Sequence, residues 1–451
     1  MAPLPVVALD VGGATLKASR IHSGGGHKHA KHGAVSNGTV VTLANQVATV
    51  GGSSGLQLMG KELLAKERQR AKLHYVRPIE RGYCVNWNIE SDLWTHLFSS
   101  KMLHVDPRDH ALVATAPLFA PAALSETMDQ VVFEEFGFAS HARVSAAEMC
   151  VLSYAEYCRQ QSEGGDATAS VEPSPKRKRP ASSAPVASPI PSTAESYEDW
   201  RAFHRSSCQL VIDSGFSFTH VVPVIDGKVF LPGVKRINVG GKLLTNYLKE
   251  IVSYRQWNVM DESVVINELK EALCYCSLDL DQEMEQYHRD RSTRKHWVLP
   301  DFVRSFHGRL RADRQTADDE EQALEMGVEM VTVPEVLFHP SDIGIDQAGL
   351  AETIMQCVNA CPPDVQSTLL DNILLVGGNT KFRNFRERLE RELRPLVPDE
   401  FEFRLLAPDN PISTAIEGCS LFASSDKLSS RSVTKQEYDE HGSNICFQRF
   451  R

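Results

Sequence analysis

The sequence has no apolar run approaching the roughly 20 residues that a membrane-spanning helix requires. Apolar residues make up 42% of its 451 residues, and charged residues, 24%, interrupt them throughout. The first apolar stretch, in "MAPLPVVALDVGGATLKAS", leads directly into Asp10, which is typical of a strand rather than a signal peptide. We therefore expect a soluble intracellular protein, long enough for two or three domains with separate cores.

Patterns for zinc binding, P-loop nucleotide hydrolysis and cationic surfaces are also missing. The ten cysteines form no CxxC pair, and the spacings within "CYC" (274–276) and "CVNAC" (357–361) do not fit a zinc knuckle. We interpret them as reduced structural thiols. No GxxxxGK[ST] motif is present, so the chain supplies no P-loop motor of its own. With 48 Lys and Arg against 58 Asp and Glu, the net charge of −10 disfavours nucleic acid over the surface as a whole, although a local basic patch could still bind it.

A weak internal repeat is present instead. Residues 5–19 and 208–225 each contain a β-forming run, an aspartate, small residues and a second β-forming run. Backbone N–H groups at such a turn can surround a phosphate, and the aspartate can hold a hydrated metal ion. An ordinary chain reversal is the alternative for each turn alone. The candidate binding residues are Asp10, Gly12, Gly13 and Lys17 in the first hairpin, and Asp213, Ser214 and Gly215 in the second.

Two double glycines follow the hairpins. Gly240 and Gly241 lie in "NVGGKLL", and Gly377 and Gly378 lie in "VGGNT" after a buried-looking strand. Glycine lets the backbone approach a nucleoside closely, although a strand-to-helix turn explains each pair equally well. Together with the hairpins, the double glycines favour two α/β lobes that face a common cleft.

Three polar segments are expected to lie outside the lobes. Residues 22–38 contain four histidines that could bind a metal ion, but a solvated loop is the simpler interpretation. Residues 162–200 are rich in Ser, Pro and Ala, so we expect disorder. At their centre "PKRKRP" (175–180) offers four consecutive cations, which favours nuclear import over a merely solvated charge run. Residues 285–325 are expected to form a surface insertion anchored by "WVLPDFV".

Several longer stretches show a family resemblance. "KEALCYCSLDLDQEM" (270–284), "PEVLFHPSDIGIDQAGL" (334–350) and "ILLVGGNT" (373–380) resemble the actins and actin-related proteins over nearly the whole chain outside the insertions. More narrowly, "DSGFSFTHVVP", "RINVGGKLLTNYLKEIVSYRQWNVMDE" (236–262), "RPIERGYCVNWNIE" (77–90) and "VLPDF" (298–302) resemble the actin-related protein 6 class, a nuclear branch of that superfamily.

The resemblance implies an α/β, actin-like two-lobed fold with duplicated ribonuclease-H-like domains and a central nucleotide cleft. Residues 1–161 would form the first lobe, with a small subdomain at about 35–75, and residues 201–425 the second lobe. Residues 426–451 would return toward the first lobe. The bound cofactor would be ATP or ADP, with Mg²⁺. By resemblance, Lys17 would contact phosphate, Asp10 and Asp213 would hold the water shell of the metal ion, Lys270 and Glu271 would flank the nucleoside, and Gly377 and Gly378 would lie beneath it.

Two departures from actin bear on catalysis. Actin has an acidic residue and a glycine where this chain has Phe216 and Ser217, and the actin glutamine that positions the attacking water corresponds to Ala146. A methyl group cannot orient water, and loss of such a group costs orders of magnitude in rate. We expect a structural nucleotide and little or no hydrolysis, and we regard His220 as structural in the absence of a water-positioning partner.

The resemblance implies a non-catalytic subunit of a nuclear Swr/SRCAP-type chromatin remodeller that exchanges a histone variant. Its partners would be the motor subunit, a small zinc-finger subunit and, through the complex, the nucleosome. A four-charge patch would add only a modest, salt-sensitive contact to DNA or acidic surfaces. The alternatives are a polymerising actin-like ATPase, which the two departures and the long insertions oppose, and a sugar or acetate kinase of the same fold, since fold alone does not confer function.

Overall fold

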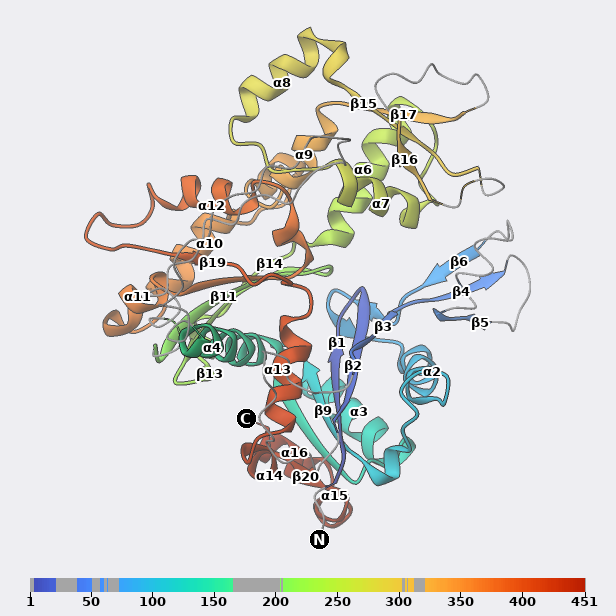
Figure 1. Ribbon diagram of the computed structural model, residues 1–451, viewed down its shortest axis with the longest axis vertical. Coiled ribbons are helices and arrows are strands. Elements are labelled where there is room, and N and C mark those ends of the chain that lie inside the picture. The colour runs from blue at the N-terminus through green and yellow to red at the C-terminus, as the bar shows by residue number, and fades with distance from the viewer. Residues whose placement is uncertain are drawn as a thin grey trace, which may run out of the picture.

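The computed structural model describes residues 4–21, 39–50, 57–60, 73–164, 206–301, 307–311 and 321–450, together with Leu63, Phe203 and Ser305. Two mixed sheets form the centres of two lobes, with helices between and around them (Figure 1). The histidine-rich segment 22–38 and the basic run 175–180 lie outside the described residues.

The first lobe is built on a six-stranded sheet in the order β20-β10-β9-β1-β2-β3. Its β1–β2 hairpin is antiparallel and places Asp10 opposite Lys17, while β9 runs parallel to β1 on the other side. Most residues of β1 and β9 are buried, as expected for central strands covered on both faces. The strands are β1 (Val6–Val11), β2 (Thr15–Ile21), β3 (Val41–Ala44), β9 (Ala111–Ala116), β10 (Ser140–Ser145) and β20 (Val433–Thr434).

The second lobe repeats this plan. Its β11–β12 hairpin is antiparallel, β18 runs parallel to β11, and the order is β13-β12-β11-β18-β19 with β14 paired to β12. The weak repeat in the sequence is thus confirmed as a structural duplication. The strands are β11 (Cys208–Ser214), β12 (Thr219–Ile225), β13 (Lys228–Val229), β14 (Lys235–Ile237), β18 (Ile373–Val376) and β19 (Leu405–Leu406).

Helices α4 (Ala146–Gly164) and α13 (Thr414–Ala423) lie between the two sheets (Figure 1). α4 contributes to the buried clusters of both lobes, and α13 packs against α4 and β1. The two helices cross very closely: a Cβ on Gly418 of α13 would lie 1.9 Å from the backbone oxygen of Met149 in α4. The lobes are therefore joined by the pair of helices near the expected boundaries at 161 and 425.

Smaller units flank each sheet. A short sheet in the order β5-β4-β6 lies within the expected subdomain at 35–75, and a β16-β15-β17 sheet lies within 285–325. Besides Trp297 of the expected anchor, Leu324 and Met326 also join the core of the second lobe. The first-lobe elements are β4 (Val47–Val50), β5 (Gln57–Leu58), β6 (Leu73–Val76), β7 (Ile79–Glu80), β8 (Tyr83–Cys84), α2 (Trp87–Phe98) and α3 (Ala122–Gln130).

The helical part of the second lobe lies above its sheet in Figure 1. The helical spacing of Val265, Leu269, Leu273 and Cys276 in the sequence predicts a helix that reaches Cys276. α7 ends earlier, at Leu273, and Tyr275 forms a bridge with Arg383. In the part of the chain that the structure describes, no helix is long and apolar enough to cross a membrane. The elements are α6 (Gly241–Arg255), α7 (Ser263–Leu273), α8 (Leu280–Arg289), β15 (Lys295–Val298), β16 (Arg309–Leu310), β17 (Ala323–Met326), α9 (Glu329–Glu335), α10 (Leu350–Asn359), α11 (Pro363–Leu370) and α12 (Phe385–Leu393).

The C-terminal segment returns to the first lobe. β20 pairs with β10, and the side chains of Thr434 and Glu437 form a capping box at the start of α15. The Tyr438 ring stacks on Phe133 with 4.5 Å between centroids, which fixes the last helices under the first sheet. These helices are α14 (Lys427–Arg431), α15 (Lys435–His441) and α16 (Ser443–Arg449).

The crossing of α4 and α13 gives a direct test of the fold. In an open helix, Gly→Ala stabilises by about 1 kcal/mol through helix propensity. At Gly418 the added methyl group would overlap the backbone of α4, so we expect Gly418→Ala to destabilise by about 2 kcal/mol or more, measured by urea unfolding. The control is Gly327→Ala, whose added Cβ meets only the flexible side chain of Arg294, at 3.5 Å. Equal stability of the two variants would contradict the close crossing.

Candidate functional site between the two hairpins

The turns of the two hairpins touch each other. In the first turn, Gly12 N–H donates to the backbone oxygen of Thr15 at 3.1 Å, and a Cβ at Gly12 would approach that oxygen to 2.7 Å. A Cβ at Gly13 would lie 2.4 Å from Ser217 Oγ in the second turn. The backbone at Gly13 therefore lies against side chains of the other lobe, and only glycine fits at position 13 without a shift.

Asp10 and Lys17 pair within the first hairpin. Lys17 Nζ lies 2.8 Å from Asp10 Oδ2, and Thr115 Oγ1 donates to Asp10 Oδ1 at 3.0 Å. Both ionised side chains are buried, where a paired charge is far less costly than an isolated one. The ion pair is directly behind the turn that carries Gly12 and Gly13.

Asp213 occupies the equivalent place in the second lobe but lacks such a partner. Among the described residues, no hydrogen bond or ion pair reaches its carboxylate. Burial, and then the charge of Asp10, raise its pKa from 3.8 to about 6, against an opposing effect of Lys17. Lys17 thus pairs with Asp10 and offsets the charge of Asp213 only in part, an arrangement that favours an additional cation.

The end of β18 forms the floor beside Asp213. Gly377 has φ +93°, and a Cβ there would lie 2.3 Å from the backbone oxygen of Ser214. The side-chain amide of Asn379 donates to Ser214 Oγ at 3.1 Å and to the oxygen of Gly215 at 2.8 Å. A Cβ on Gly378 would meet nothing within 4 Å, so its surroundings are open. Gly377 is therefore required by the backbone, whereas Gly378 leaves free space.

Gly241 and Lys270 connect this floor to the helical part of the second lobe. Gly241 starts α6, and its N–H donates to the oxygen of Gly215 at 3.0 Å. Lys270 Nζ donates to the oxygen of Gly241 and to the side chains of Thr245 and Asn267 at 2.9–3.0 Å. Burial lowers the pKa of Lys270 to about 8. Glu271 is exposed and accepts a hydrogen bond only from Asn267, at 2.8 Å, among the described residues.

Comparison with known proteins places this geometry in a family. The profile of the actin family matches residues 6–451. The chain belongs to the actin family. Actin-related protein 6 of Arabidopsis thaliana is 37% identical to it over 83% of this chain and 85% of that protein. The actin-like protein ARP6 of Yarrowia lipolytica is 35% identical over 86% and 87%, and actin-related protein 6 of Drosophila melanogaster 34% identical over 83% and 85%.

The actin-family site fits a nucleotide with a divalent cation. The uncompensated carboxylate of Asp213 beside Asp10 suits a cation, and the open space next to Gly378 leaves room for an anionic ligand. Asp10 and Asp213 would hold the water shell of the cation, and Lys17, which is paired with Asp10 in this structure, would contact a phosphate. All of the assigned binding roles stay predictions, those of Ser214, Lys270 and Glu271 included.

Phe216 departs from the actin pattern and forms a contact that the sequence did not reveal. Its ring lies between the lobes, about equally close to Cβ positions on Gly13 (3.6 Å) and Gly241 (3.5 Å). The Arg77 guanidinium lies 4.6 Å from the ring centroid, and it donates to the oxygens of Gly13 and Ala14 at 3.4–3.5 Å. Burial lowers the pKa of Arg77 to about 10. The ring therefore packs under an arginine from the opposite lobe.

A second arginine-aromatic contact lies beside the first. Arg236 is 4.4 Å from the Phe218 centroid and donates to Tyr83 Oη at 3.2 Å and to the oxygen of Arg81 at 3.1 Å. The Phe218 ring also fills the space next to Gly82, where a Cβ would come within 1.7 Å of it. We call Arg77, Phe216, Phe218 and Arg236 the arginine-aromatic clasp, because these contacts link the β6–β8 region of the first lobe to the second lobe.

His220 and Ala146 define the catalytic potential of the site. Burial and the nearby Arg236 lower the pKa of His220 to about 4, so its ring, 4.2 Å from Phe218, is neutral near pH 7. Ala146 is the first residue of α4, and the preceding Ser145 has a buried Oγ without a hydrogen-bond partner among the described residues. The methyl group of Ala146 supplies no hydrogen-bonding group for water, whereas the buried His220 Nε2 has no hydrogen-bond partner among the described residues.

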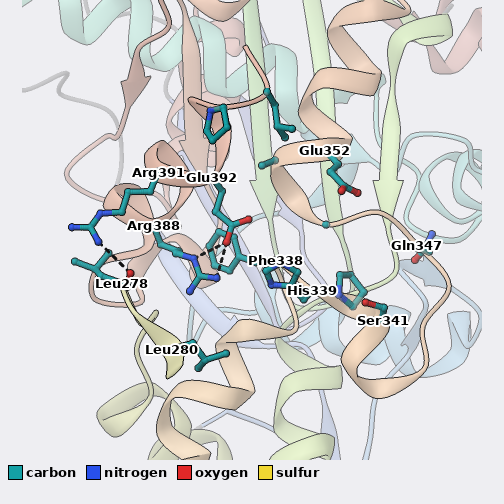
Figure 2. A pocket seen from close by; sticks show the side chains of 15 residues that line it. Leu278, Leu280, Phe338, His339, Ser341, Gln347, Glu352, Arg388, Arg391 and Glu392 are labelled. Atoms are coloured by element: carbon teal, nitrogen blue, oxygen red, sulfur yellow. Dashed lines mark hydrogen bonds and ion pairs between the residues drawn. The ribbon is translucent and has the colours of Figure 1, made fainter. Parts of the chain in front are cut away.

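A separate cavity of about 570 Å³ lies between α10, α12 and the loops at 278–280 and 338–349 (Figure 2). Ligand atoms of Glu335, His339 and Glu392 lie within 4.8 Å of one another there, as in a metal site. However, Arg388 already donates to both Glu335 oxygens at 2.6 and 2.9 Å and to Glu392 at 2.7 Å. The guanidinium supplies the positive charge, so these groups are explained as an ion-pair network.

Because the charge of Asp213 is uncompensated, we expect its removal to stabilise the folded protein, by an amount that depends on pH. Because its pKa is raised from 3.8 to about 6, ionised Asp213 destabilises the folded state increasingly as pH rises through that range. We expect Asp213→Asn to raise the free energy of unfolding of the ligand-free protein by on the order of 2 kcal/mol at pH 7.5, and clearly less at pH 4.5. Urea unfolding at both pH values measures this, with the exposed Asp399→Asn as control. An increase in the free energy of unfolding that is the same at both pH values would show that the charge of Asp213 is not its cause.

The arginine-aromatic clasp predicts that Phe216 holds the lobes together without a ligand. We expect Phe216→Ala to lower the free energy of unfolding by about 1–2 kcal/mol and to accelerate amide hydrogen exchange at both hairpin turns. Tyr254→Ala, which removes an exposed ring elsewhere, is the control and should change neither measurement. Unchanged exchange at the first turn, around Gly13, would show that the ring does not restrain the opposite lobe.

Proposed function

We propose that this actin-related protein is a non-catalytic subunit of a nuclear chromatin-remodelling complex of the Swr/SRCAP type. In that role it supports ATP-dependent histone-variant exchange and nucleosome binding, while another subunit supplies the motor. Its partners in this proposal are the motor subunit, a small zinc-finger subunit and, through the complex, the nucleosome.

The observation that carries the non-catalytic part of the proposal is the second hairpin. Where actin has a carboxylate, Phe216 packs between Gly13 and Gly241 under Arg77. The aromatic ring has no oxygen atom to bind a metal ion or its water shell, and the methyl group of Ala146 cannot orient water. Loss of one oriented polar group typically lowers a rate about 10²–10³-fold, so the combined replacement supports very slow or absent hydrolysis.

Nucleotide binding is proposed to be structural. The open space next to Gly378, together with Lys17 and the two carboxylates Asp10 and Asp213, would receive ATP or ADP with Mg²⁺. When bound, the nucleotide would supply negative charge to the turns and its cation would offset the carboxylates. Ligand that binds only the folded chain stabilises it by mass action, which suits a subunit whose task is to keep its shape.

The proposed place in a nuclear complex rests on the relatives that are named actin-related protein 6 and on the basic run 175–180. Four consecutive cations flanked by proline suit an import receptor. The overall charge of −10 favours contacts with proteins rather than direct wrapping of DNA. A filament-forming ATPase remains the competing function, because Asp10, Asp213 and His220 are all retained.

The deciding experiment quantifies adenine nucleotide released from the purified, denatured chain by chromatography and phosphate release from the intact chain. We expect near-stoichiometric nucleotide and no sustained phosphate release above a blank without protein. Sustained release that Asp213→Asn abolishes would instead establish an ATPase.

The assembly is tested separately, by affinity capture of the tagged chain from nuclear extract and mass spectrometry. We expect a remodelling motor and a small zinc-finger protein in stoichiometric amounts. A variant with residues 176–179 replaced by alanine should lose nuclear accumulation yet still bind these subunits when they are mixed as purified proteins. Capture of actin-like filaments without remodelling subunits would overturn the proposal.

A further inference from the structure

The end of α6 and the loop that follows it expose three large side chains within seven residues. Tyr254 is 90% exposed, Trp257 47% and Met260 43%. Among the described residues, Trp257 is the only tryptophan with such exposure. Tyrosine, tryptophan and methionine are the residue types enriched in the centres of protein interfaces. We refer to Tyr254, Trp257 and Met260 as the 254–260 surface.

The backbone beneath this surface is firmly held. The side chain of Gln256 exchanges two hydrogen bonds with the backbone of Glu325, at 2.8 and 2.7 Å, along the outer edge of β17. Trp257 Nε1 donates to the oxygen of Ala323 in the same strand at 3.2 Å. The exposed rings are thus presented from an ordered loop, and binding to them would require little further ordering.

The surroundings of the surface are acidic. Glu250, Asp261 and Glu262 are exposed, and no ion pair joins them to any of the residues described. Glu250 lies one helical turn before Tyr254, on the same face of α6. The charges of Asp261 and Glu250 both act on Lys249, and the Lys249 amine donates to the oxygen of Met260 at 3.1 Å. The carboxylates and the exposed apolar side chains therefore belong to one area.

The nearby cations do not neutralise this area. Lys249 is buried and its amine is engaged by Met260 and, at 2.8 Å, by Ser263 Oγ. Arg255 points to α9, where it lies 3.0 Å from the buried carboxylate of Glu329. Lys242 lies near the opposite end of α6. The 254–260 surface is left with exposed aromatic rings and unpaired negative charge.

We propose that the 254–260 surface is a docking site for a lysine- and arginine-rich segment of a partner protein. Cationic side chains interact favourably with the faces of Tyr and Trp rings, and the three carboxylates would attract them and set the register. A nucleic acid would be repelled by the same carboxylates. The proposal needs neither a bound nucleotide nor the remodeller assignment, so it can fail while the proposed function stands.

The test uses the full-length chain and a fluorescein-labelled peptide of alternating Lys-Gly and Arg-Gly units, followed by fluorescence anisotropy. We expect saturable binding that weakens about tenfold in Tyr254→Ala/Trp257→Ala, as for aromatic residues at the centre of an interface. The triple variant Glu250→Gln/Asp261→Asn/Glu262→Gln should also bind more weakly and with less dependence on salt. Phe119→Ala, which removes another exposed ring, is the matched control and should bind like the parent.

Folding and alternative occupants are separated by further variants. Trp257→Ala removes a hydrogen bond, so Tyr254→Ala alone must also weaken binding, by at least about threefold, with an unchanged circular dichroism spectrum. Parental affinity of the double variant, or equal binding of a Glu-Gly peptide, would overturn the proposal. Peptide binding that appears only after residues 176–179 are replaced by alanine would identify the chain's own basic run as the occupant. Self-association that the double variant abolishes would identify a second copy.

Discussion

Contact between the two hairpin turns constrains the whole molecule. Gly13 and Ser217 come from different lobes, and a Cβ on Gly13 would lie only 2.4 Å from Ser217 Oγ. Because each turn extends from the first two strands of its sheet, their contact fixes how the sheets face each other and brings Asp10 near Asp213. The electrostatics of the cleft follow from this placement. Lys17 pairs with Asp10, and burial makes the unpaired negative charge of Asp213 costly. A ligand site arises here because the lobes meet at strand ends.

The arginine-aromatic clasp changes what this cleft can do. In the second hairpin, Phe216 contacts Arg77 and Phe218 contacts Arg236. Both arginines belong to the protein, so these contacts do not require a bound ligand. Each such contact contributes about 0.5–2 kcal/mol, according to how well it is shielded from water. The arrangement of the two lobes therefore depends less on the chemical state of a ligand.

Helix α6 connects the cleft between the lobes to the exposed 254–260 surface. α6 begins at Gly241, which is hydrogen-bonded to the second hairpin, and ends at the loop that carries Trp257. The same helix thus runs from the contact between the lobes to an exposed aromatic area, and the edge of β17 anchors its far end. A surface held in this way loses little conformational entropy when a partner binds.

The sequence by itself determined the local parts: both hairpins, the turn glycines, the actin-family fold, and the replacements Phe216 and Ala146. Alternation of β-forming residues and glycine at tight turns are encoded within a few neighbouring residues, so they can be read directly. It did not reveal Arg77 as the partner of Phe216, the overlap that makes Gly418 necessary, the early end of α7, or the burial of Leu324 and Met326. Only the tertiary structure decided these, because each depends on contacts between segments far apart in the chain, whose energies no local pattern records.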